Sequence, residues 1–145
     1  MKKLAVVGAG GHGSVVEDTA LNCGWDIIEY FDDNLPLCER VGRKKIVGNC
    51  DVLYNSKRIN DVVIAIGDSK VRFNLMNKFE RAGFNFPVLI HGSAYVSDNV
   101  SIGAGSVIFA GSVIQPGCLI GKSVIINTGA TIDHDSKISS GAHIC

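Results

Sequence analysis

His134 is followed directly by Asp135 in the last part of the chain, and this pair is well suited to move a proton. The ordinary pKa of a histidine is about 6.5, so its neutral ring can accept a proton near neutral pH. A neighbouring carboxylate can fix the ring tautomer and stabilise the imidazolium that forms. The alternatives are an ordinary surface histidine and an aspartate that only serves a turn. We predict that His134 is a general base and that Asp135 orients it.

A glycine-rich segment near the N-terminus has the spacing G-x-G-x-x-G and runs Gly8-Ala9-Gly10-Gly11-His12-Gly13. Between a strand and a helix, such a segment lets backbone N–H groups approach a diphosphate. His12 could donate to a phosphate or be a loop histidine facing solvent, and the segment could be only a tight turn. We predict that Gly10, Gly11, His12 and Gly13 bind the phosphates of a nucleotide.

Asp32 follows Gly13 by 19 residues and could accept a hydrogen bond from a ribose hydroxyl. The motif alone suggests NAD. The unit around it, however, has only four or five expected strands, fewer than the six of two mononucleotide-binding halves. A single nucleotide carrying a diphosphate, such as a nucleotide sugar, therefore fits better than a dinucleotide.

The second half of the chain has a strict period of six residues. Nine aliphatic side chains follow it: Val96, Ile102, Ile108, Ile114, Ile120, Ile126, Ile132, Ile138 and Ile144. A hexapeptide repeat is typical of a parallel β-helix, in which each hexapeptide forms one face and a turn. Three faces make a coil, so Val96, Ile114 and Ile132 should stack in one internal column. His134 should then point outward, since Asp98 and Pro116 occupy its place in the two preceding coils.

Residues 1–91 have a different pattern, in which expected strands alternate with expected helices. The strands are expected at 3–7, 26–31, 44–47, 61–66 and 86–90, and the helices at 14–23, 50–55 and 69–82. Alternation of this kind predicts a small Rossmann-like parallel sheet covered by helices. Ligands of such sheets bind beyond the carboxyl ends of the strands, where Asp32, Asp33 and Gly67 stand. We predict two domains, a nucleotide-sugar-binding unit at 1–91 and a β-helix at 92–145.

Composition narrows the class of protein further. Fourteen basic residues balance fourteen acidic ones, so no positive surface for nucleic acid is indicated. No apolar run reaches the roughly 18 residues of a membrane span. The five cysteines are scattered and odd in number, which favours reduced thiols in a cytoplasmic protein without a metal site. The last repeat ends at Cys145 without a polar cap, so we expect the β-helix to be incomplete, as in a fragment of a longer protein.

The two halves together resemble the bacterial sugar O-acyltransferases of the sialic acid O-acetyltransferase type, and most closely the UDP-4-amino-sugar N-acetyltransferases. The residues that carry the resemblance are Gly8 to Gly13 with Glu17-Asp18, Phe31-Asp32-Asp33, Ile64-Ala65-Ile66-Gly67, Leu89-Ile90-His91 with Ser93-Ala94, Asn127-Thr128, and Ile132-Asp133-His134-Asp135. The resemblance covers the whole chain. It implies a left-handed β-helix, a homotrimer and acetyl-CoA as donor.

The resemblance also implies roles for single residues. His134 and Asp135 match a catalytic His–acid pair, although the family's acid is commonly the longer glutamate. Asn127 and His143 match residues at the acetyl-CoA site. The glycine segment, Asp32-Asp33 and Gly67 match the nucleotide-sugar site.

The sequence therefore predicts an enzyme that transfers an acetyl group from acetyl-CoA to the amine of a nucleotide-linked amino sugar. Cys118 stands at an inward place of the repeat, so direct transfer is favoured over a covalent acyl-enzyme. Three other functions fit less of the sequence: an O-acetyltransferase acting on a sialic acid-like sugar, a non-catalytic nucleotide-binding trimer, and an NAD-binding oxidoreductase.

Overall fold

The computed structural model describes residues 1–36, 40–41 and 44–145; Cys38, one of the five cysteines, lies outside them. The N-terminal unit contains a sheet with the strand order β3-β4-β2-β1-β5. Its parallel strands are β1 (Lys3–Val7), β2 (Ile27–Phe31), β4 (Lys44–Gly48) and β5 (Val62–Ile64), and β3 (Arg40–Val41) pairs antiparallel with β4. The expected parallel sheet is confirmed, and β5 is shorter than predicted.

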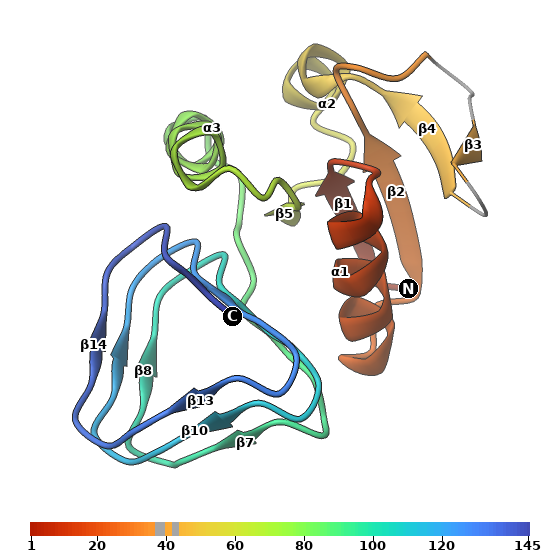
Figure 1. Ribbon diagram of the computed structural model, residues 1–145. Coiled ribbons are helices and arrows are strands. Elements are labelled where there is room, and N and C mark those ends of the chain that lie inside the picture. The colour runs from red at the N-terminus through yellow and green to blue at the C-terminus, as the bar shows by residue number, and fades with distance from the viewer. Residues whose placement is uncertain (37–39, 42–43) are drawn as a thin grey trace.

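Helices cover both faces of this sheet (Figure 1). Helix α1 (Gly11–Asn22) lies between the sheet and one side of the second unit, while α2 (Cys50–Ser56) and α3 (Ser69–Arg81) cover the opposite face. Helix α1 begins at Gly11, three residues earlier than predicted. It buries Val16, Thr19 and Ala20, whereas Val15 is 38% exposed.

Helix α3 begins at the predicted residue and ends one residue earlier than predicted. The Asp68 side chain caps its first turn by accepting a hydrogen bond from the Val71 N–H, 2.9 Å away. Gly83, with a φ of +91°, follows the helix. Helix α3 buries Arg72, Met76 and Phe79, whereas Val71 is 49% exposed.

The second unit is a three-sided parallel β-helix (Figure 1). Its strands are β6 (Leu89–Ile90), β7 (Tyr95–Val96), β8 (Ser101–Ile102), β9 (Val107–Ile108), β10 (Val113–Ile114), β11 (Leu119–Ile120), β12 (Ile125–Ile126), β13 (Thr131–Ile132), β14 (Lys137–Ile138) and β15 (His143–Ile144). They form three parallel sheets, in the orders β13-β10-β7, β14-β11-β8 and β15-β12-β9-β6. Residues 18 apart are paired in register, as Val96, Ile114 and Ile132 show, so the predicted coil is confirmed.

Side chains on the six-residue period fill the interior of the β-helix with an apolar cluster. The turns follow the same period, since seven successive turn residues have a positive φ: Gly105, Gly111, Gly117, Ser123, Gly129, Asp135 and Gly141. Glycine serves these turns because an L side chain disfavours that conformation. The turn geometry explains why Asp135, the carboxylate next to His134, stands in a left-handed backbone position.

The segment 86–90 was predicted as the last strand of the N-terminal unit, and this prediction was wrong. The strand there is β6, and it pairs with β9 as part of the β-helix. Leu89 and Val107 pack with α1 and the sheet in one shared core. The two units are therefore packed together along the β-helix sheet that contains β6, β9 and β12. Within the part of the chain described, no helix is long and apolar enough to cross a membrane.

Candidate active site

A cavity of about 620 Å³ opens beyond the carboxyl ends of β1, β2 and β5. Its lining residues are Val7, Gly8, Asp32, Asp33, Asn34, Cys50, Ile66, Val71, Asn74, Leu75 and Lys78. This volume falls within the usual range for small-molecule sites, about 300–1,000 Å³. The structure thus brings Gly8, Asp32 and Asp33 together at the sheet edge where the sequence placed a ligand.

Two of the glycines are required by packing. Gly8 has a φ of +106°, and a Cβ there would lie 2.5 Å from the carbonyl oxygen of Ala65; a Cβ at Gly13 would overlap the carbonyl oxygen of Gly8. Gly10, Gly11 and Gly67 differ, since an added Cβ at any of them would meet no atom within 4 Å. These three positions are open to an approaching ligand, whereas Gly13 holds α1 close to β1.

The expectation that residues 8–13 form one turn was wrong in its second half. Gly11, His12 and Gly13 belong to the first turn of α1. None of the three lines the cavity. The N-terminus of α1 still presents its first N–H groups beyond β1, which is where a helix favours an anion.

Asp32 and Asp33 hold the loops that surround the cavity. Asp32 Oδ2 accepts a hydrogen bond from the Ala9 N–H (3.0 Å), and its Oδ1 accepts from the Asn34 N–H (2.8 Å). Asp33 Oδ1 accepts from the Cys50 N–H (2.8 Å). A carboxylate has about four lone-pair sites, so each can accept a further bond from a ligand. Burial, with the Asp33 carboxylate, raises the pKa of the Cys50 thiol to about 12, so this thiol is neutral.

One wall of the cavity comes from α3, which the sequence analysis did not assign to the site. Val71, Asn74, Leu75 and Lys78 lie on one face of this helix and line the cavity. Lys78 also lies over the Tyr54 ring, with Nζ 5.2 Å from its centroid. One feature of the sequence could have indicated this wall. Asn74 and Lys78 are polar residues four apart on the same helix face as the apolar Val71 and Leu75.

Lys44 is a second residue near the site that was not predicted from the sequence. It is buried at the start of β4, and its Nζ donates to the carbonyl oxygens of Ala9 (3.0 Å) and Gly10 (2.7 Å). Its burial could have been inferred from its position in the strand, because alternate residues face the same side and Lys44, Ile46 and Gly48 are the buried ones. Lys44 therefore fixes the direction of two carbonyl groups in the glycine-rich loop.

His134 and Asp135 lie at the β-helix corner between β13 and β14. His134 Nδ1 is 2.8 Å from Asp135 Oδ2, and both side chains are exposed. This hydrogen bond, helped by the charge of the carboxylate, raises the pKa of His134 above its ordinary value. The Asp135 N–H donates to the carbonyl oxygen of Pro116, which anchors the turn. The predicted outward histidine with a carboxylate partner is therefore present.

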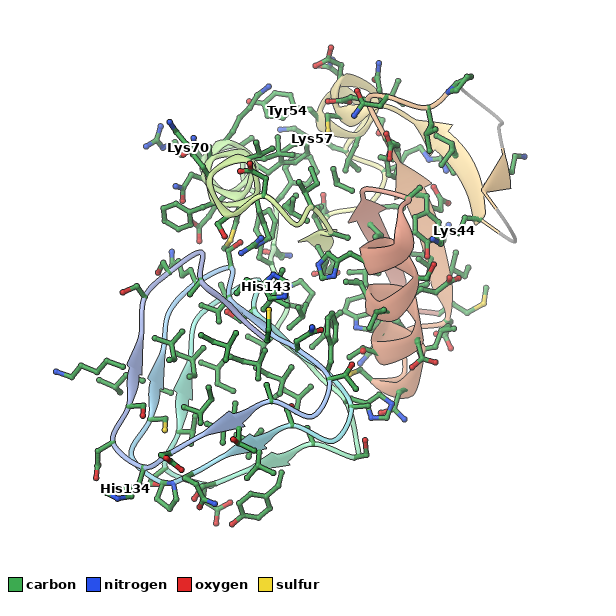
Figure 2. The ribbon with its side chains drawn as sticks, in the orientation of Figure 1. Lys44, Tyr54, Lys57, Lys70, His134 and His143 are labelled. Atoms are coloured by element: carbon green, nitrogen blue, oxygen red, sulfur yellow. The ribbon has the colours of Figure 1, made fainter. Side chains whose placement is uncertain are left out.

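His143 lies on another side of the β-helix. Figure 2 shows His143 on the side facing the N-terminal unit and His134 at a corner directed away from it. His12 reaches the same junction as His143, with its ring edge-on to Phe109 (5.6 Å between centroids). Burial, together with the charges of Arg72 and His143, lowers the pKa of His12 to about 4. His12 is therefore neutral near pH 7.

Asn127, directly after β12, is half-buried, and its N–H donates to the carbonyl oxygen of Ile144. The predicted site residues thus fall into three places. Asp32 and Asp33 line the cavity, whereas Gly10 and Gly67 do not; His12 and His143 lie near each other at the junction of the two units; His134 and Asp135 stand apart. Among the described residues, no group of three or more His, Cys, Asp or Glu side chains could hold a metal ion.

Comparison with known proteins agrees with this architecture. The family described as PglD N-terminal domain matches residues 3–79. UDP-N-acetylbacillosamine N-acetyltransferase of Bacillus subtilis (strain 168) is 38% identical over 115 residues, which are 76% of this chain and 52% of that protein. The chain thus spans about half the length of this curated relative.

Solved structures show the same fold over nearly the whole chain. The acetyltransferase domain of PglB from Neisseria gonorrhoeae FA1090 is 37% identical with a TM-score of 0.91, covering 99% of this chain and 70% of that chain. PerB from Caulobacter crescentus, in complex with CoA and GDP-perosamine, is 32% identical with a TM-score of 0.89, covering 99% and 68%. The fold and the His–Asp corner define the class of hexapeptide-repeat acyltransferases. Within that class, the chain belongs to the PglD-type N-acetyltransferase family.

Proposed function

We propose that this protein transfers the acetyl group of acetyl-CoA to the amine of a nucleotide-linked amino sugar. The observation that carries the proposal is the hydrogen-bonded His134–Asp135 pair on the β-helix, in a chain that also has a ligand-sized cavity at the sheet edge. The relatives named above act on, or are bound to, substrates of this class by their descriptions.

The reaction requires a proton to leave the attacking amine. In the proposed mechanism the amine nitrogen attacks the thioester carbonyl carbon, and His134 Nε2 takes the proton. The new C–N bond forms as the C–S bond breaks, and the CoA sulfur leaves as a thiolate that is then protonated. Asp135 accepts from Nδ1–H, which leaves Nε2 as the basic nitrogen and stabilises the imidazolium.

The nucleotide sugar would occupy the cavity. Asp32 and Asp33 would accept from sugar or base hydroxyl and N–H groups, while the open backbone at Gly10, Gly11 and Gly67 would let the diphosphate approach. Gly13 would serve by packing α1 against the loop. His12, being neutral, would offer a hydrogen bond but no charge to the phosphates.

The donor would lie along the β-helix, with Asn127 and His143 on its wall. His134 points away from the N-terminal unit of its own chain, so a sugar held in the cavity of that unit cannot meet it there (Figure 2). We therefore propose a homotrimer in which the cavity of one chain works with His134 of another. Three-fold packing of β-helices would place such a corner beside a neighbouring N-terminal unit.

A panel of UDP- and GDP-linked amino sugars, incubated with acetyl-CoA and monitored for free CoA thiol, tests the activity. We expect thiol release with at least one amino sugar and none with the matching hydroxyl sugar. Release only with the hydroxyl sugar would establish O-acetylation instead. No release with any sugar, in a protein that binds both substrates, would contradict the proposal.

Mixed trimers test the shared site. His134→Ala and Gly10→Trp chains, each inactive alone, should recover activity when unfolded together and refolded as a mixture. Recovery requires a cavity and a base from different chains. A mixture as inactive as its components would show that each site lies within one chain.

A further inference from the structure

Arg72 is a buried cation on α3 that neither lines the cavity itself nor belongs to the His–Asp corner. Arg72 is only 2% exposed to solvent. Among the residues that the structure describes, no carboxylate lies within ion-pair distance of it, and every hydrogen-bond partner is neutral. Burial lowers the pKa of its guanidinium, and the charge of Asp68 opposes that effect only in part. Burying a charge without a direct ion-pair partner is unfavourable unless hydrogen bonds replace the lost water.

The partners of Arg72 fall on two separate parts of the chain. Nη1 donates to the carbonyl oxygens of Ile66 (2.9 Å) and Gly67 (3.0 Å), in the loop after β5. Ile66 lines the cavity, so this end of the guanidinium holds the cavity wall.

The other nitrogens reach the β-helix. Nε donates to the carbonyl oxygen of Ser123 (3.0 Å), and Nη2 donates to that of Gly141 (2.6 Å) with a longer contact to Ala142 (3.4 Å). Gly141 and Ala142 directly precede His143. One planar group therefore joins the cavity loop to the backbone that carries a proposed donor-site histidine.

Further contacts join α3 to the same corner of the β-helix. Ser123 and Gly141 are stacked turn residues at one corner of the β-helix, and α3 rests on that corner. Phe73 packs near Gly141, where an added Cβ would lie 3.5 Å from the Phe73 Cβ. On the outside of the same junction, Lys122 Nζ forms an exposed ion pair with Glu80 Oε1 at 3.0 Å.

We propose that Arg72 is a positioning residue that couples the nucleotide cavity to the donor wall by binding backbone carbonyls of both. This inference rests on the proposed function, because it assigns the two walls to one reaction. The five N–H donors of arginine lie in a planar fork that reaches both segments at once. A lysine has three donors on one nitrogen, so it can satisfy one segment but not both.

The full chain with Arg72→Lys tests the coupling without any need for turnover. We expect the affinity for UDP, measured by calorimetry, to fall about fivefold or more, the lower end of typical coupling between sites. In the same sample, histidine ring NMR signals should change for His12 and His143 but not for His91 and His134. Loss of stability alone would not select these two of the four histidines.

Turnover supplies the second readout. Arg72→Lys should lower kcat about 10- to 100-fold, the scale expected when reacting groups are displaced by about 1 Å. The matched control is Lys122→Met, which breaks the exposed ion pair between the same two elements. It should leave UDP affinity, the histidine signals and kcat unchanged.

A second variant keeps the test decisive if Arg72→Lys does not fold. Gly141→Ala strains the left-handed turn whose carbonyl Arg72 binds, and it should weaken UDP binding at the cavity. Gly129→Ala carries the same turn strain with no neighbour within 4 Å and should not. Unchanged UDP affinity in Gly141→Ala, or in folded Arg72→Lys, would overturn the inference.

The inference and the proposed function can fail separately. If no amino sugar is acetylated but UDP affinity and the His12 and His143 signals respond to Arg72→Lys, the function is wrong and the coupling stands. If the wild-type protein turns over and Arg72→Lys matches it in all three measurements, only the coupling is wrong.

Discussion

The carboxylate of Asp135 reaches back to its own neighbour, so that Oδ2 lies 2.8 Å from Nδ1 of His134. It can do so because Asp135 has a φ of +58°, at the turn position that glycine fills in most of the other turns. The ring is thereby held with Nε2 free at an exposed corner of the β-helix. Two adjacent residues form the catalytic pair that we propose, with no further side chain needed to join them.

Replacing His134 with alanine should lower kcat at least about 100-fold, the usual scale for loss of a general base. The KM for the nucleotide sugar should change little, because the proposed nucleotide-binding residues belong to the cavity and His134 is not among its lining residues. Steady-state kinetics with both substrates checks this. Lys137→Ala, an exposed change on the adjacent β14, is the control. A His134→Ala protein that keeps most of its kcat would remove the base assignment.

Asp135→Asn should move the acidic limb of the pH–rate profile to lower pH. A base works in its neutral form, so activity is lost as pH falls through the pKa of His134. Asp135 raises that pKa, mainly through the hydrogen bond, and asparagine removes the charge that supports it. Asparagine also tolerates the left-handed backbone, so the turn should persist. Profiles of kcat/KM for the two proteins give the comparison, and a limb that stays in place would show that another group titrates.

Gly117→Ala should lower kcat by displacing Asp135, because a Cβ at Gly117 would overlap Asp135 Oδ1. Gly117 is one coil before Asp135 and has a φ of +78°. The matched control is Gly129→Ala, with a φ of +69° and no atom within 4 Å of the added Cβ. Both changes carry a similar backbone strain of about 1–2 kcal/mol. Equal kcat in the two variants would show that Asp135 does not act through its position.

Gly10→Val should lower the affinity for the nucleotide sugar without lowering Tm, whereas Gly13→Ala should lower Tm. An added Cβ at Gly10 meets no protein atom within 4 Å, so Tm should hold while nucleotide-sugar binding is lost. A methyl group at Gly13 overlaps the carbonyl oxygen of Gly8, and overpacking of this kind costs about 1–3 kcal/mol of stability. Thermal unfolding and calorimetry with a UDP-sugar separate the two. Full affinity in a folded Gly10→Val protein would mean that the glycine segment does not approach the ligand.

Much of the fold could be predicted because its signals are local and repeated. The six-residue period places Val96, Ile114 and Ile132 in one column, since a strand face and a turn of fixed length repeat with the sequence. The N-terminal strands and helices follow from apolar runs and glycine breaks. The exception was 86–90, because an apolar strand of a few residues does not say which sheet it joins, and β6 joined the β-helix.

The site residues also divide into those that the sequence predicted and those that only the tertiary structure revealed. Sequence alone determined that His134 has a carboxylate beside it and points outward, because both properties follow from adjacency and the repeat. It also indicated that Asp32 and Asp33 stand at a strand end. Only the tertiary structure decided that Val71 and Lys78 line the cavity, and that His12 meets His143 at the junction.

Arg72 marks the limit of local patterns. On the helix it stands between Val71 and Phe73 like any surface cation, yet it is buried against carbonyl oxygens 51 and 69 residues further along the chain. Backbone carbonyls are present at every residue, so the sequence carries no sign of which ones a side chain will meet. Which carbonyls Arg72 meets depends on where α3 packs against the corner of the β-helix, and only packing between distant segments determines that position.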